Sequence, residues 1–166
     1  MNNNSMNNKK KIPTDGITSD IDLYNLANKI KIKLNGIYFK DELPLPHLGN
    51  YIINLASSND NSGGTHWVHC ELKNENNIRK TIYFDPFGIP EPTLVTKFLM
   101  QWVNNNFNNI IRNTHDIQNI NSNYCGEYNI LCISYMDSHI EPLKQRLYNF
   151  INNFKTYTNK WNNINI

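Results

Sequence analysis

The middle of this chain consists of short apolar segments separated by turn-forming residues, and this pattern constrains the fold more than any other feature. Three segments rich in β-branched and aromatic residues predict strands at 51–55, 66–72 and 78–84. The polar link 73–77 is short enough for a hairpin, so the second and third strands are expected to pair. The connection 59–64 is rich in turn-forming residues. We therefore expect a β-sheet at the centre of the domain.

Apolar residues recur at helical spacing in four segments outside these strands. The first begins after a capping residue, Thr18 or Ser19, and ends before Asn35. The second follows Pro92, and two more lie near the end of the sequence. The four apolar stripes are Leu23, Leu26, Ala27 and Ile30; Leu94, Val95, Phe98, Leu99 and Trp102; Tyr128, Leu131, Cys132, Tyr135 and Met136; and Leu143, Leu147, Phe150, Ile151 and Phe154.

Two more extended segments and two breaks complete the pattern. Residues 37–39 look extended, and 110–118 can supply another short strand. The Pro-containing segment 41–49 is expected to be a loop, and 104–109 interrupts the helical pattern. Strands in the middle with helices around them predict an α+β fold, in which a central mixed β-sheet is flanked by helices.

The length of 166 residues fits one compact domain. Residues 1–16 contain too few apolar side chains to repay ordering, so we expect a flexible polar arm there, a domain over 17–155 and a tail over 156–166. No apolar run approaches the roughly 20 residues that a membrane span needs, and the Asn/Lys-rich start is unlike a signal peptide. We expect no contact with a membrane.

Charge and composition exclude little and point to no partner by themselves. The net charge of +2 is too mild to indicate nucleic-acid binding, although Lys9, Lys10 and Lys11 can touch phosphate weakly. About a fifth of the residues are Asn, which is typical of an A/T-rich genome. Three cysteines, an odd number, argue against a disulfide framework and favour a reducing compartment.

Cys125 is the first candidate for chemistry. It stands at the start of the predicted helix that contains 128–136, after the polar turn 119–123. The positive end of a helix dipole favours a thiolate at this position. Gly126 removes a side chain where a substrate backbone would approach. A Cys-Gly pair at a helix start is weak evidence when taken alone.

His66 and Asp85 are the candidate base and the residue that orients it. His66 stands at the entry of one predicted strand, and Asp85 follows the end of the next. If these strands are neighbours, their paired ends bring the two side chains together, and Cys125 can join them at one edge of the sheet. His66 taken alone also fits a half-buried strand histidine.

Gln118 is the candidate oxyanion donor. It lies seven positions before Cys125, and its amide can donate beside the Cys125 backbone N–H to the oxyanion that forms when a carbonyl is attacked. One such donor typically lowers a barrier by about 3 kcal/mol. A lone Gln at a strand end is otherwise unremarkable.

The remaining histidines have simpler interpretations. His47 lies in the Pro-containing loop, His69 is expected to face away from His66, and His115 and His139 lie in polar surroundings.

Cys70 and Cys132 are expected to be buried structural thiols, because one lies on a strand and the other in an apolar stripe. A zinc site from His66, Cys70, Cys125 and Cys132 lacks any close pair with the usual metal spacing. We therefore predict no metal site.

These motifs together resemble one family. The sequence contains, in order, His66-Trp67, Asp85-Pro86-Phe87-Gly88, Gln118 and Cys125-Gly126. This series is similar to that of the adenovirus-type cysteine proteases (adenain), which share a fold and a catalytic order with the SUMO-specific Ulp proteases. The segments 63–67, 82–88 and 121–126 also look like adenain segments. The likeness covers the chain from about Thr18 to the helix after Pro142.

The resemblance implies an adenain/Ulp-like fold with the nucleophile at a helix N-terminus. It implies a Cys–His–Asp triad of Cys125, His66 and Asp85, with Gln118 as oxyanion donor. Trp67 matches the aromatic residue of the family that packs over the active site, where it and Gly126 are expected to contact substrate.

The small members of this family process capsid and core precursors of double-stranded DNA viruses and Polinton-like elements, near Gly or other small residues. The resemblance thus implies a virion-maturation endopeptidase, as in a virophage, acting in the virion and in the viral factory of the host cytoplasm. The alternatives are a Ulp-like peptidase that removes ubiquitin-like modifiers at Gly-Gly, and a non-catalytic capsid-associated protein.

Two features depart from the adenain pattern. Asp85 stands where adenain has Glu, although Ulp-type relatives use Asp. Adenain is activated by a peptide that forms a disulfide with a cysteine outside the active site, but this chain has no Cys between Cys70 and Cys125. No cofactor is required by the sequence, and neither an activating peptide nor DNA is supported as an activator.

Overall fold

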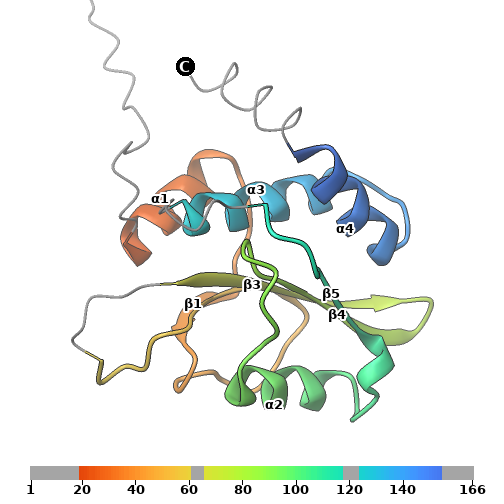
Figure 1. Cartoon of the computed structure of the whole chain (residues 1–166), viewed down its shortest axis with the longest axis horizontal. Coiled ribbons are helices and arrows are strands. Elements are labelled where there is room, and N and C mark those ends of the chain that lie inside the picture. Colours follow the sequence, from red (N-terminus) through yellow and green to blue (C-terminus); the bar gives the residue numbers. More distant parts are fainter. Residues whose placement is uncertain (1–18, 61–65, 118–123, 155–166) are drawn as a thin grey trace, which may run out of the picture.

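A five-stranded mixed β-sheet forms the centre of the protein, as predicted (Figure 1). The computed structural model describes residues 19–60, 66–117 and 124–154. Along the sheet the strands follow sequence order: β1 (Gly36–Phe39), β2 (Gly49–Asn54), β3 (Trp67–Glu75), β4 (Ile78–Phe84) and β5 (Ile110–Arg112). The edge strands β1 and β5 pair in parallel with their neighbours, while β2, β3 and β4 pair antiparallel.

Helices cover both faces of this sheet and confirm the α+β prediction. Figure 1 shows α1, α3 and α4 on one side of the sheet and α2 on the other. A short 3-10 turn, η1 (Phe107–Asn109), precedes β5. The helices are α1 (Asp20–Lys29), α2 (Thr93–Trp102), α3 (Cys125–Asp137) and α4 (Leu143–Asn152).

Capping residues and alternating strand faces explain these elements. Ser19 caps α1, because its side chain accepts from the backbone N–H of Asp22 while the Asp22 carboxylate accepts from the backbone N–H of Ser19. Along β3, Cys70 and its even-numbered neighbours pack into the core beneath α2, whereas Trp67 packs on the other face with α1 and α3. Cys132 lies in the core between α3, α4 and β4. Cys70 and Cys132 are both fully buried, as predicted.

One predicted boundary is wrong, for an identifiable reason. The expected link 73–77 is mostly strand, because a turn of only Asn76 and Asn77, with φ of 53° and 63°, joins β3 to β4. Asn tolerates this left-handed conformation better than most residues. The short strand predicted within 110–118 is β5, which ends at Arg112, where the next side chain, Asn113, bonds to the backbone of Asp85.

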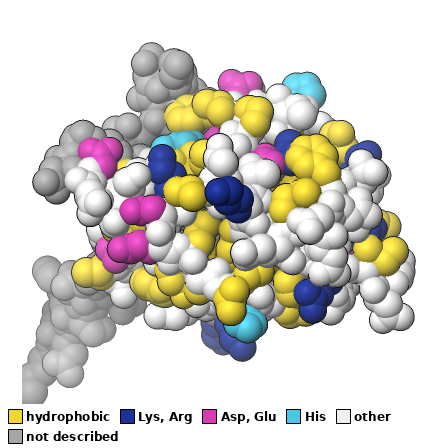
Figure 2. All heavy atoms as spheres, turned by 90° about the horizontal axis from the view of Figure 1, so that it is seen from below, with side chains coloured by type: hydrophobic (Ala, Val, Ile, Leu, Met, Phe, Trp, Pro, Cys, Tyr) yellow, Lys and Arg dark blue, Asp and Glu magenta, His cyan; other side chains and the backbone are white. Residues whose placement is uncertain are grey.

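The described residues include no helix that is both long and apolar enough to cross a membrane. Figure 2 shows the face that carries α2, on which Lys and Arg side chains stand apart from one another and are mixed with acidic and polar groups. The predicted arm 1–16 and tail 156–166 lie outside the described residues.

Candidate active site

Cys125 is the first residue of α3, as predicted, and its side chain is 5% exposed. The backbone N–H of Trp67 donates to its Sγ at 3.5 Å. The free N–H groups and the dipole at a helix N-terminus favour negative charge at this point. Two independent features, the helix end and a donated N–H, thus favour a thiolate at Cys125.

His66 and Asp85 meet at the paired ends of β3 and β4, as predicted. Nε2 of His66 donates to Oδ1 of Asp85 at 2.8 Å. The Asp85 side chain is 1% exposed and that of His66 is 22% exposed. Because the carboxylate holds Nε2–H, the other ring nitrogen, Nδ1, is the one left for the Cys125 thiol.

The charged form of His66 is favoured by its two partners. Burial opposes the imidazolium, but hydrogen bonds to the Asp85 carboxylate and to the Cys125 thiol outweigh it and raise the pKa of His66 to about 9. His66 is therefore protonated at neutral pH. An imidazolium beside a thiol at a helix N-terminus is the arrangement that yields a thiolate–imidazolium pair.

Phe87 fixes the plane of the His66 ring. Phe87 lies in the turn that follows β4, and His66 directly precedes β3. The two rings stack with centroids 4.7 Å apart and planes 27° apart. The backbone N–H of Phe87 also donates to Oδ1 of Asp85 at 2.8 Å. One residue therefore contacts both the base and the carboxylate that orients it.

Gly88 allows the chain to turn sharply after Phe87. Its φ is +68°, and its backbone N–H donates to the carbonyl of Asp85 at 2.8 Å. A Cβ atom here would lie 2.9 Å from the backbone carbon of His115. The glycine is required both by its left-handed conformation and by this close approach.

Asn113, which is 5% exposed, holds the backbone of Asp85. Its Oδ1 accepts from Asp85 N–H at 3.0 Å, and its Nδ2 donates to the Asp85 carbonyl at 2.6 Å and to the His115 carbonyl at 3.1 Å. Asp85 is thus fixed at its main chain by Asn113 and at its side chain by His66 and Phe87.

The other predicted site residues are placed as follows. Trp67 is 5% exposed and packs in the same apolar cluster as Cys125, so most of its indole is buried. Gly126 is buried in the first turn of α3. Gln118, the predicted oxyanion donor, lies outside the described residues. Substrate contact by Trp67 and Gly126 stays a prediction.

The remaining histidines differ from His66. Burial, with Lys73 nearby, lowers the pKa of His69 to about 3, so this fully buried ring is neutral and cannot replace His66 as the charged partner. The prediction that His139 lies in polar surroundings is wrong in part, since its ring stacks on Tyr135 with centroids 3.8 Å apart. His47 and His115 are exposed.

Among the described residues, no group of three or more His, Cys, Asp or Glu side chains is placed to hold a metal ion. The zinc combination considered above fails on geometry, because Cys70 faces the α2 side of the sheet while Cys125 and Cys132 lie on the other side.

Three contributors to the site were not predicted: Phe87, Asn113 and Asn129. Phe87 lies inside the motif 85–88, but its contact with His66 depends on the turn that follows β4. Asn129 was detectable as a polar residue one helical turn after Cys125, within an otherwise apolar stretch. Asn113 carried no comparable signal.

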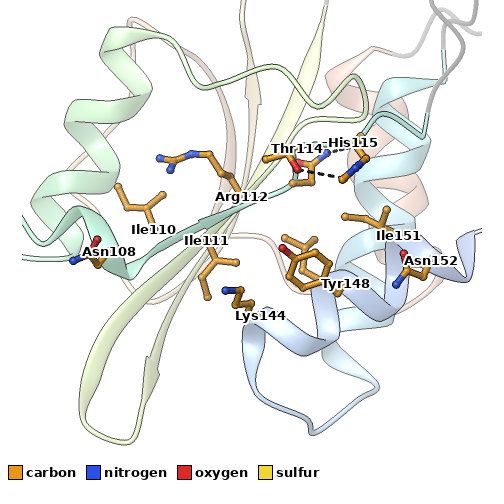
Figure 3. Close-up of a pocket in the computed structure, with 12 residues that line it drawn as sticks. Asn108, Ile110, Ile111, Arg112, Thr114, His115, Lys144, Tyr148, Ile151 and Asn152 are labelled. Atoms are coloured by element: carbon orange, nitrogen blue, oxygen red, sulfur yellow. Dashed lines mark hydrogen bonds between the residues drawn. The ribbon is translucent and has the colours of Figure 1, made fainter.

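A cavity of about 600 Å³ lies apart from Cys125, between the edge strand β5 and α4. Figure 3 shows Lys144 and Tyr148 of α4 opposite Ile111 of β5. Asn113 also lines this cavity. The same asparagine therefore contacts Asp85 and borders the cavity.

Comparison of the chain with protein-family models gave no match, and a search of curated proteins gave none either. The function is therefore inferred from the geometry of the site and from the order of its residues. The described part of that site brings together the Cys125 thiol, the His66 imidazole and the Asp85 carboxylate, and the imidazole is hydrogen-bonded to the carboxylate.

Proposed function

We propose that this protein is a cysteine endopeptidase of the adenain/Ulp type. One observation carries the proposal: Cys125, His66 and Asp85 come from three separate segments and form one hydrogen-bonded series at a helix N-terminus. Burial of an acid, a base and a thiol costs stability unless they interact, and catalytic sites are where such groups gather.

The reaction follows from the geometry. The Cys125 thiolate attacks the carbonyl carbon of the scissile bond and forms a tetrahedral intermediate. The Cys125 backbone N–H, and Gln118 by the resemblance, donate to its oxyanion. His66 gives its proton to the leaving amine, and the C–N bond breaks to leave a thioester. A water molecule, deprotonated by His66, then hydrolyses the thioester and regenerates Cys125.

Asp85 has two roles in this reaction. It holds Nε2–H, which keeps Nδ1 directed at the sulfur, and it stabilises the imidazolium. The stacked Phe87 ring restricts rotation of the imidazole about its plane. His66 can thus move a proton between sulfur, amine and water with little reorientation.

The substrate class is proposed from the resemblance. The Asp-Pro-Phe-Gly segment and the seven-position interval between Gln118 and Cys125 resemble adenain more than Ulp, which favours cleavage of viral capsid or core precursors near Gly or other small residues. The proposed place of action is the virion and the viral factory in the host cytoplasm. The mixed sheet flanked by helices, with the thiol at a helix start, supports the adenain/Ulp assignment.

Incubation with the capsid proteins encoded by the same genome, followed by intact-mass measurement, tests the proposal. We expect discrete products that end near a small residue, and their complete loss in Cys125→Ala. Cys132→Ala is the matched control, because it removes a buried thiol from the same helix and should cleave normally.

Full activity of Cys125→Ala would disprove the assignment, as would loss of activity in Cys132→Ala alone. A parallel reaction with a conjugate of a ubiquitin-like modifier ending in Gly-Gly distinguishes a capsid-processing endopeptidase from a Ulp-like peptidase. Cleavage of that conjugate, with capsid proteins left intact, would identify the Ulp-like alternative.

A further inference from the structure

Asn129 is a fully buried polar residue on α3, one helical turn after Cys125. Its Nδ2 donates to the carbonyl of Trp67 at 2.7 Å and to the carbonyl of Cys125 at 2.7 Å. Both amide hydrogens are thus used, and each bonds to a different segment. The side chain joins the first turn of α3 to the entry of β3.

Trp67 links this amide to the catalytic pair. It follows His66 directly, its N–H donates to Sγ of Cys125 at 3.5 Å, and its carbonyl accepts from Asn129. The backbone of one residue therefore contacts the nucleophile on one side and Asn129 on the other. The bonds that Trp67 makes to Cys125 and to Asn129 are separate from the contact between His66 and the Cys125 thiol.

Packing alone does not explain an amide at this position. The next helical residues, Ile130, Leu131 and Ile133, are apolar and buried, and a Leu side chain would have nearly the shape of Asn129. A buried amide is favourable only when it is hydrogen-bonded. Its Oδ1 has no hydrogen-bond partner among the described residues, so its value lies in the two bonds that Nδ2 donates.

We propose that Asn129 is a positioning residue that sets the separation between Cys125 on α3 and His66 at the entry of β3. This inference rests on the proposed function, because it concerns the same thiolate–imidazolium pair. Without the amide, the carbonyls of Trp67 and Cys125 lose their shared donor, and the start of α3 can move relative to β3. The thiolate then loses part of its stabilisation by His66.

Alkylation of Cys125 tests this without any peptide substrate. Its rate with iodoacetamide is measured by peptide mass spectrometry across pH, in the full chain and in Asn129→Leu. A free thiol reacts slowly at about pH 6, because its pKa is about 8.5. We expect fast alkylation of the wild type at that pH and a loss of up to about tenfold in Asn129→Leu, the largest effect that a one-unit shift in thiolate formation can have. At pH values well above the thiol pKa, the alkylation rates of the wild type and of Asn129→Leu should agree.

Cys132→Ala is the control, because it alters the buried face of the same helix without touching Trp67 or Cys125. Its pH profile should match the wild type. Asn129→Ser provides a second variant that is less disruptive to folding. A helical Ser hydroxyl bonds the carbonyl four residues earlier, so the Cys125 bond is kept while the Trp67 bond is lost, and a loss in the same direction is expected.

The outcomes distinguish failure of the positioning role of Asn129 from failure of the proposed function. An unchanged pH profile in folded Asn129→Leu or Asn129→Ser overturns the positioning role, even if either variant is less stable. An equal shift in Cys132→Ala also overturns it, because any core change would then suffice. A wild-type profile like that of a free thiol overturns the thiolate–imidazolium pair, and with it both the positioning role and the proposed function.

Discussion

Replacement of Asp85 by Asn removes the negative charge beside His66 and keeps the shape of the side chain. Oδ1 of Asp85 accepts from His66 Nε2 and from the backbone N–H of Phe87, each at 2.8 Å. The amide oxygen of Asn can accept from the same two donors. Asp85 is 1% exposed, so in the variant water cannot reach this position to stabilise the His66 imidazolium in place of the carboxylate. Asp85→Asn therefore tests the charge itself.

The expected size follows from the strength of the bond. A hydrogen bond to a charged group contributes about 1.5–3 kcal/mol and one between neutral groups about 0.5–1.5 kcal/mol. The difference, roughly 1–1.5 kcal/mol, corresponds to about one pKa unit. The pKa of His66, which burial opposes and Asp85 and Cys125 together raise to about 9, should therefore fall by about one unit in Asp85→Asn.

The sign for stability follows from the same shift. The pKa of His66 is higher in the folded protein than in the unfolded chain, so its contribution is complete below the unfolded value and is lost as pH rises through about 9. In Asp85→Asn the loss should occur at lower pH. At neutral pH the free energy of unfolding should be lower by roughly 1 kcal/mol.

Nuclear magnetic resonance of the imidazole protons provides the assay. The His66 Cε1–H signal is assigned by its absence in His66→Asn, and its shift is followed against pH in the wild type and in Asp85→Asn. Asp116→Asn is the matched control, because it removes an exposed carboxylate from the neighbouring segment. An unchanged His66 midpoint in Asp85→Asn would refute the reasoning, as would an equal shift in Asp116→Asn.

Two further substitutions distinguish chemistry from packing. Gln118→Ala should lower kcat on a Gly-containing precursor peptide by roughly 10²-fold with little change in KM, because an oxyanion donor acts in the transition state. Steady-state kinetics that show only weaker substrate binding would contradict that role. Leu99 lies on α2 and is fully buried in the core between this helix and the sheet. Leu99→Ala should lower the free energy of unfolding by about 3 kcal/mol in urea titrations. The pH profile of Cys125 alkylation in the folded variant should stay unchanged.

Local patterns were sufficient to predict most of the fold. The strand 78–84 was predicted with its exact bounds, and the Ser19 cap and the start of α3 at Cys125 also match the structure. Those features depend on neighbouring residues alone. The extent of β3 to Glu75 and the end of β5 at Arg112 were not predicted, because they depend on turn geometry and on partners distant in sequence.

The site also contains contacts that local sequence patterns predicted and contacts that they did not. His66 and Asp85 were predicted to meet because adjacent antiparallel strands bring known ends together. Asn113 and Asn129 act on backbone groups of residues distant in sequence, Asp85 and Trp67, and the side-chain type reveals no such target. In a sequence this rich in Asn, no local signal distinguishes Asn113 from the other Asn residues, whereas Asn129 is marked only by its place in an apolar helical stretch.

The sheet topology explains why these groups converge at one edge. β4 runs antiparallel to β3 and parallel to β5, so the start of β3 and the ends of β4 and β5 lie at the same edge. These three strand ends supply His66, Asp85 and Asn113 in spatial order, and each contacts the next. The parallel pairing of a strand as short as β5 is explained by this role, because an antiparallel β5 would place Asn113 at the opposite edge, away from Asp85.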